Sequence, residues 1–160
     1  RLVNFVMELQ TQIKLTTPML GSNFTSEKIR RFSKDSQNDM FLAVDQQQWT
    51  EAFEKAINIL ELQCDPANIF VPQTMLSPTL RLYRRNINKS KVEVFESIQK
   101  NTILTFNIAV ASSTNNQITQ SMLEEIFKTI GKYIGLSEWG SKFGFGRFAL
   151  NYVKQLKNDK

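Results

Sequence analysis

The chain has 160 residues, of which 41% are hydrophobic and 22% charged, and its 20 Lys and Arg outnumber 15 Asp and Glu. This composition predicts one soluble globular domain, and no apolar run approaches the roughly 20 residues of a membrane-spanning helix. One cysteine and no histidine exclude an internal disulfide, ordinary zinc sites and Ser-His or Cys-His nucleophile pairs. A net charge of +5 suits a polyanionic partner or simply a basic protein, and one free thiol fits a cytoplasmic location.

The first predicted element is a strand over residues 2–16, where apolar and polar side chains alternate. Residues 20–45 are predicted to be an insertion into the domain. Within it, residues 20–39 are polar and predict a loop, and Met40–Val44 predicts a short strand. The insertion carries four cations that could contact a polyanion, although a solvated connection is the simpler explanation for them: Lys28, Arg30, Arg31 and Lys34.

The middle of the chain predicts a helix followed by strands. Residues 46–62 show apolar residues at helical spacing after a capping-box pattern at Asp45–Gln48. Strands are predicted over residues 79–87, 92–98 and 101–111, the last with the clearest alternation.

The second predicted helix covers residues 119–134, with a capping box at Ser121–Glu124 and Gly135 as its C-terminal glycine cap. A last strand follows at about residues 145–154. Residues 155–160 are predicted to be a frayed tail. The side chains of the last strand that we expect to face the core are Phe148, Leu150 and Tyr152.

The order of these elements, without the insertion, is β-α-β-β-α-β. It predicts a single α+β domain over residues 1–160 with a ferredoxin-like fold. Two helices would cover one face of an antiparallel sheet, a polar face would remain open, and a glycine-rich loop would precede the last strand.

The most informative segment is residues 135–148, because four of the six glycines lie within twelve residues among basic and aromatic side chains. Glycine amides can hold phosphates, cations can neutralise them, and aromatic rings can stack on bases. The aromatic residues could equally be core side chains. The candidate nucleic-acid-binding residues are Lys142 and Arg147 for phosphates, Gly140, Gly144 and Gly146 for the backbone, Trp139 for stacking, and Arg81, Tyr83 and Arg85 on one face of the strand over residues 79–87.

A β-α-β-β-α-β order with this loop resembles the RAMP superfamily of CRISPR-associated RNA-binding proteins. The similar residues are Ile134-Gly135-Leu136 at the start of the loop and Gly144-Phe145-Gly146-Arg147-Phe148 at its end. Gly135-Leu136 with Trp139, followed by Gly146-Arg147-Phe148, is closer still to small uncharacterised phage and prophage proteins. The resemblance covers residues 118–153 and implies RNA binding. It does not extend to RNA cleavage, because RAMP endonucleases often use a histidine that this chain lacks.

Two functions are therefore expected. The first is a non-catalytic module for RNA or single-stranded DNA, in a CRISPR-related or phage nucleoprotein complex. The alternative is a phage-encoded protein-interaction module that binds or inhibits a host immune or replication complex. An enzyme is not expected, because no carboxylate is marked by its spacing as an acid or base, so we predict no catalytic residues, metal or cofactor.

Overall fold

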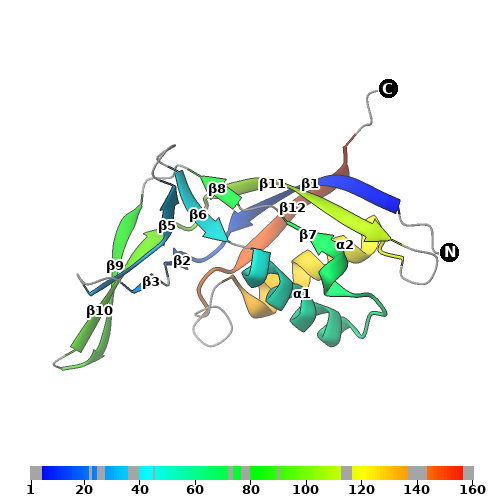
Figure 1. The fold of residues 1–160 in the computed structure, drawn as a ribbon. Coiled ribbons are helices and arrows are strands. Elements are labelled where there is room, and N and C mark those ends of the chain that lie inside the picture. The colour runs from blue at the N-terminus through cyan, green and yellow to red at the C-terminus, as the bar shows by residue number, and fades with distance from the viewer. Residues whose placement is uncertain are drawn as a thin grey trace.

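The computed structural model describes residues 5–21, 23–24, 28–35, 40–44, 46–71, 74–76, 80–89, 91–112, 117–136 and 144–156. This part of the chain is α+β, with strands in three sheets and almost all strand pairs antiparallel (Figure 1). The helical elements are α1 (Gln46–Leu60), the 3-10 helix η1 (Pro66–Asn68), and α2 (Gln120–Thr129), which continues into the π-helix η2 (Ile130–Ile134). None of the described helices combines the length and the apolar character needed to cross a membrane.

The sheet nearest the helices has the strand order β12-β1-β11-β7, and every pair in it is antiparallel. Its strands are β1 (Phe5–Leu15), β7 (Ile69–Phe70), β11 (Ile103–Ser112) and β12 (Phe148–Gln155). Strands β1, β11 and β12 confirm three predicted strands. Both α1 and α2 lie on the same side of this sheet (Figure 1).

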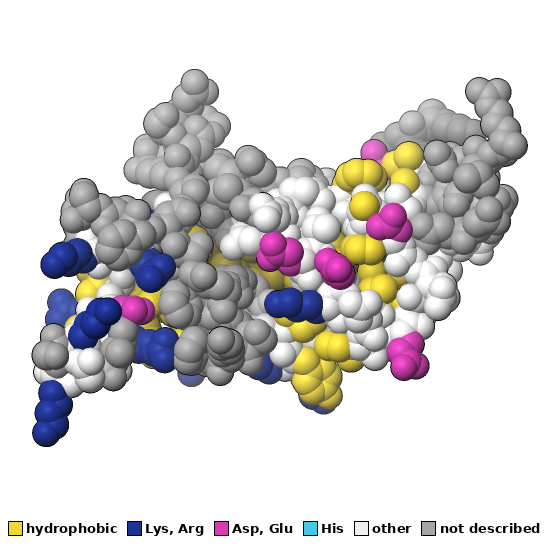
Figure 2. Space-filling model, turned by 60° about the horizontal axis from the view of Figure 1, so that its bottom comes forward, with side chains coloured by type: hydrophobic (Ala, Val, Ile, Leu, Met, Phe, Trp, Pro, Cys, Tyr) yellow, Lys and Arg dark blue, Asp and Glu magenta, His cyan; other side chains and the backbone are white. Residues whose placement is uncertain are grey.

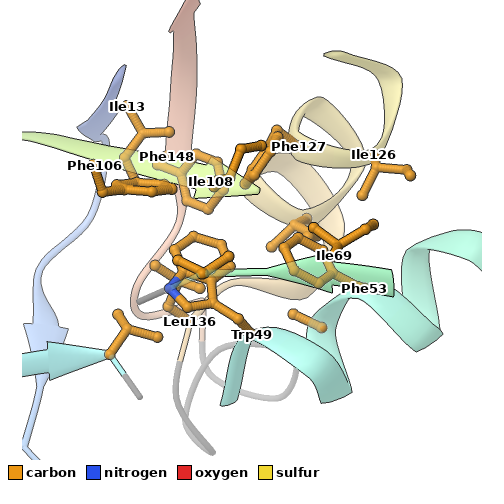
Figure 3. Close-up of a cluster of buried hydrophobic side chains, with 14 of the residues drawn as sticks. Ile13, Trp49, Phe53, Ile69, Phe106, Ile108, Ile126, Phe127, Leu136 and Phe148 are labelled. Atoms are coloured by element: carbon orange, nitrogen blue, oxygen red, sulfur yellow. The ribbon is translucent and has the colours of Figure 1, made fainter. Parts of the chain in front are cut away.

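The core lies between this sheet and the two helices, and Trp49 is at its centre (Figure 3). The ring of Trp49 lies 5.1 to 5.6 Å, centroid to centroid, from the rings of Phe53, Phe106 and Phe127. The alternation predicted for β11 is confirmed, because the four apolar side chains expected on one face are buried: Leu104, Phe106, Ile108 and Val110.

A β-bulge halfway along β12 reverses which of its side chains point toward the core. The register against β1 shifts between Gln12 and Ile13, so that Asn151 is the extra residue in β12. Beyond the bulge, Val153 is buried and the Tyr152 hydroxyl donates to Gln10 Oε1 at 3.0 Å on the polar face. The prediction of an inward Tyr152 is therefore wrong, because one added residue moves every following side chain to the opposite face.

The second sheet contains the β9–β10 hairpin, which extends away from the helices (Figure 1). Strand β10 pairs with β9 along one edge, and with β2 and β4 along the other. The strands of this sheet are β2 (Met19–Leu20), β3 (Asn23–Phe24), β4 (Ile29–Arg31), β9 (Arg81–Asn88) and β10 (Lys91–Ile98). The predicted strands over residues 79–87 and 92–98 thus exist, but outside the sheet that packs on the helices.

The third sheet has the order β5-β6-β8, from strands β5 (Ser33–Asp35), β6 (Met40–Val44) and β8 (Thr74–Leu76). The strand predicted at Met40–Val44 is confirmed. The loop predicted over residues 20–39 is wrong in part, because β3, β4 and β5 lie within it. These strands are two or three residues long and form by pairing with distant segments, so local propensity does not reveal them.

The helix ends follow the predictions only in part. Gly135 ends the second helix with φ +76°, and its amide donates to the Ile130 carbonyl at 2.7 Å, as expected of a glycine cap. The N-cap of α2 is Thr119, whose hydroxyl accepts from the Met122 amide at 3.1 Å, and not Ser121 as predicted. The Asp45 cap lies outside the described residues. The start of the predicted frayed tail is hydrogen-bonded to β1, because the Leu156 amide donates to the Glu8 carbonyl at 3.0 Å.

Candidate nucleic-acid interface

Residues 135–148, called the glycine segment below, have two ends that are hydrogen-bonded to each other and to the chain after β1. The Leu136 amide donates to the Gly146 carbonyl at 2.9 Å, and the Gly146 amide donates to the Pro18 carbonyl at 2.7 Å. The Arg147 amide donates to Thr17 Oγ1 at 2.9 Å. These amides are satisfied within the protein. A phosphate bound by backbone amides of the segment would therefore have to use amides other than these three.

Core side chains anchor the same two ends. Leu136 is 1% exposed and Phe148 is 4% exposed, and both belong to the cluster around Trp49 (Figure 3). The Trp49 and Phe148 rings are 6.5 Å apart, centroid to centroid. The segment therefore begins and ends at fixed points of the core.

Glycine is required at two positions of the segment, but for different structural reasons. Gly146 has φ +69°, and a Cβ built on it would lie 2.1 Å from the Leu136 carbonyl oxygen, so a side chain has no room there. Gly144 has φ +78°, but its nearest neighbour to such a Cβ is Arg147 Nε at 3.9 Å. Gly146 is thus required by both backbone conformation and close approach, and Gly144 by backbone conformation alone.

The end of the glycine segment contacts the β9 strand through two aromatic rings. The Tyr83 and Phe145 rings meet nearly at right angles, with centroids 5.2 Å apart. Alternation along β9 places Arg81 and Arg85 on the same face as Tyr83. The structure therefore brings together two groups of residues that the sequence analysis selected separately.

A further cation joins this face from β4. Phe95 on β10 is opposite both Tyr83 on β9 and Arg30 on β4. The guanidinium carbon of Arg30 lies 6.0 Å from the centre of the Phe95 ring, within range of a cation–π interaction. The name basic face is used below for Arg30, Arg81, Tyr83 and Arg85 together with Gly144–Gly146, at the described end of the glycine segment.

Positive charge is concentrated on the second sheet. Its strands and turns carry eight described cations but only two described carboxylates, Glu93 and Glu96, whereas the other described residues include eight basic and eight acidic ones. Figure 2 shows Lys and Arg side chains gathered at the β9–β10 end of the molecule, whereas most Asp and Glu lie over the helical part. The eight cations are Lys28, Arg30, Arg31, Arg81, Arg84, Arg85, Lys89 and Lys91.

Arg31 differs from its neighbours because it binds a buried carboxylate. Its Nη1 lies 3.1 Å from Glu96 Oε2, and Glu96 Oε1 also accepts from the Phe32 amide at 3.1 Å. Arg31 therefore helps to hold β4 on β10. Lys28 is exposed in the turn before β4, at φ +61°.

Arg147 lies apart from β9, at the end of the second helix. Its guanidinium Nη1 donates to the Lys132 carbonyl, one of the last carbonyls of η2. This contact gives Arg147 a structural role besides any contact with phosphate, since it satisfies a carbonyl at the helix end. Lys128 and Lys132 lie beside Arg147, and the sequence analysis did not select them.

Four candidate residues from the sequence lie wholly or in part outside what the structure describes. Trp139, Gly140 and Lys142 lie outside the described residues, as does the side chain of Lys34.

In the described part of the chain, no three His, Cys, Asp or Glu residues are grouped so that they could hold a metal ion. The pKa of Cys64 is raised above its usual value, first by burial and then by the neighbouring Asp65 carboxylate.

No protein-family model matches the chain, and no curated protein matches it significantly. The function proposed below therefore depends on the basic face itself.

Proposed function

We propose that the protein is a non-catalytic module that binds RNA or another single-stranded nucleic acid on the basic face. The observation that carries this proposal is the contact between Tyr83 and Phe145. It joins the glycine segment to the strand that carries Arg81 and Arg85, on the sheet where the positive charge of the chain is concentrated. A strand crossing this face would meet cations and half-buried aromatic rings together, the combination that single-stranded nucleic acids require.

The fold that we propose for the helix-covered part is ferredoxin-like and of RAMP type. In chain order its elements are β1, α1, β7, β11, α2 and β12, and the spatial order β12-β1-β11-β7 places the last strand beside the first. The glycine segment lies between the second helix and the last strand, the position it occupies in the RAMP resemblance. A place in a CRISPR-related or phage nucleoprotein complex belongs to the same proposal.

The roles on the basic face follow from chemistry and position. Arg30, Arg81 and Arg85 would neutralise phosphates, which gives affinity without reading sequence. The half-buried rings of Tyr83 and Phe145 pack against each other and would offer their remaining surface to a base. A bound strand would therefore lie across β9 and β10 and reach the end of the glycine segment.

The test is binding of short single-stranded RNA and DNA, measured by fluorescence anisotropy at several salt concentrations. We expect an Arg81→Gln/Arg85→Gln variant to bind more weakly and to lower the slope of log K against log salt by about 1 to 2, because up to two phosphate contacts are lost. A Lys55→Gln/Lys154→Gln variant makes the same charge change at two exposed positions away from the basic face, and should bind as the parent does. Absence of binding at tens of micromolar in low salt would overturn the proposal.

One observation favours the alternative, a phage-encoded module that binds a host protein. Leu82 and Val92 are 56% and 52% exposed on the face of the β9–β10 hairpin opposite Tyr83. Exposed apolar side chains on a sheet face suit a protein partner. A pull-down from nuclease-treated host lysate separates the two functions, because a partner that persists after nuclease treatment and is lost on Leu82→Asp/Val92→Asp substitution supports the alternative.

A further inference from the structure

A groove of about 500 Å³ lies between the end of the second helix and the start of β12. Lys128 from α2 and Lys132 from η2 line one side, and Arg147 with the first residues of β12 lines the other. Thr16, just after β1, contributes to the same lining. Three of the eight lining residues are cations and none is acidic.

The backbone keeps helix and strand close along this groove. A Cβ at Gly131 would lie 2.2 Å from the Phe148 carbonyl oxygen, so only glycine allows η2 to approach β12 here. The π-helical turn over Ile130–Ile134 places Lys132 directly after that contact. The groove is therefore a fixed feature of the packing between η2 and β12.

Arg147 places a fixed positive charge at the wall of the groove. Its Nη1 donates to the Lys132 carbonyl, which fixes the guanidinium across the end of the helix. Its Nε is buried and has no hydrogen-bond acceptor among the described residues. Because a buried Nε is not accessible from the groove, an anionic oxygen there would interact with the guanidinium charge and not with this N–H.

We propose that this groove binds a phosphate monoester, held by Arg147, Lys128 and Lys132. A terminal phosphate carries nearly two negative charges at neutral pH, more than the single charge of a phosphodiester, which suits three cations and no carboxylate. Arg147 also ends the glycine segment, so the groove adjoins the basic face. The proposal rests on the proposed function for one of its two sources: the phosphorylated end of a bound strand. The other source is a free mononucleotide.

The test compares strands of one RNA sequence that carry a 5′-phosphate, a 3′-phosphate or neither. We expect one phosphorylated form to bind on the order of tenfold more tightly than the unphosphorylated form, since a charge-assisted hydrogen bond is gained. A Lys128→Gln/Lys132→Gln variant should lose this advantage and still bind the unphosphorylated strand. A Lys55→Gln/Lys154→Gln variant removes the same charge from exposed positions outside the groove lining and should keep it.

A second measurement does not need strand binding. Adenosine 5′-monophosphate, adenosine 3′-monophosphate and inorganic phosphate are titrated separately while the Tm is followed, because a ligand that binds the folded state raises the Tm. We expect at least one mononucleotide to raise the Tm of the parent and of the Lys55/Lys154 control, but not of the Lys128/Lys132 variant. Arg147→Lys, which keeps the charge but lacks the planar guanidinium, should weaken the effect.

The outcomes separate the two proposals. If no strand binds but a mononucleotide raises the Tm in the expected variants, the groove is a site for free mononucleotides and the proposed function fails. If strands bind equally with and without a terminal phosphate, and no phosphate compound changes the Tm, the groove proposal is overturned while the basic face stands.

Discussion

The rings of Tyr83 and Phe145 meet edge to face, with 5.2 Å between their centroids and 74° between their planes. Tyr83 belongs to β9 in the second sheet, and Phe145 follows Gly144 in the segment that leads into β12. This contact fixes the end of the glycine segment against the hairpin. It thereby positions the cations of β9 beside the residues that precede β12.

The two rings should be energetically coupled. In a double-mutant cycle with Tyr83→Ala and Phe145→Ala, we expect a coupling energy of about 0.5 to 1.5 kcal/mol, the usual contribution of an edge-to-face aromatic pair. Urea unfolding measures it. Tyr133, which is 56% exposed, serves as the control: Tyr133→Ala combined with Phe145→Ala should be additive. Additivity in the Tyr83 cycle as well would show that the contact contributes nothing.

Alanine at the two glycines before β12 should have unequal costs. Gly146→Ala combines a strained φ with a Cβ 2.1 Å from a backbone oxygen, and we expect a loss of about 2 to 5 kcal/mol in the free energy of unfolding. Gly144→Ala has open space around its Cβ and should cost only the conformational strain, about 1 to 2 kcal/mol. Thermal or urea unfolding of the two variants checks the order. Equal losses would contradict the close approach between Gly146 and Leu136.

Trp49 should dominate the stability of the core. Trp49→Ala removes a fully buried ring that packs among four phenylalanine rings, and we expect a loss of about 3 to 5 kcal/mol. Trp49→Phe should cost less, about 1 to 2 kcal/mol, because the buried indole N–H has no acceptor among the described residues and no hydrogen bond is lost. The expectation fails if Phe and Ala are equally destabilising in urea unfolding.

Glu96 should stabilise the attachment of β4 to β10 by two separable contacts. Glu96→Ala removes the acceptor for the Phe32 amide and the partner of Arg31, at an expected cost of about 1 to 3 kcal/mol. Glu96→Gln keeps an acceptor for the amide and loses only the ion pair, which at the half-exposed Arg31 contributes about 0.5 to 1 kcal/mol. The exposed helix position Glu125 is the control, since Glu125→Ala should change the stability by less than about 0.5 kcal/mol.

Cys64 should react slowly with alkylating reagents at neutral pH. Burial and the Asp65 carboxylate raise the pKa of its thiol, so the reactive thiolate is scarcer than in a free cysteine and increases only at higher pH. Iodoacetamide labelling followed by mass spectrometry measures the rate, with the urea-unfolded chain as the reference. Asp65→Asn should speed the reaction, because it removes the negative charge while keeping an acceptor for the Ala67 amide. A folded rate equal to the unfolded rate would contradict the raised pKa.

Long elements with one buried face could be predicted from the sequence, and short or irregular ones could not. β1 and β11 alternate over ten or more residues, so their apolar faces are evident. β7 has two residues and gives no periodic signal. The bulge in β12 depends on pairing with β1, which reverses the facing of Tyr152 and Val153. Assignment of strands to separate sheets likewise depends on contacts distant in sequence.

The candidate site shows the same division. The alternation of β9 identified Arg81, Tyr83 and Arg85, and the glycine spacing identified the segment that contains Phe145, but no local pattern indicates that the two meet. Lys128 and Lys132 are four residues apart near a helix C-terminus, where cations commonly stabilise the helix dipole. Their spacing alone therefore could not distinguish them from ordinary helix-end lysines. The groove that makes them candidates exists only in the packed structure.

The hydrogen bond between Leu136 and Gly146 closes the glycine segment at its base, where both residues are already buried. A chain cut anywhere between these two residues would therefore keep both new ends attached to the same core. The second helix and β12 would stay joined through the backbone of Leu136 and Gly146 as well as through their packing.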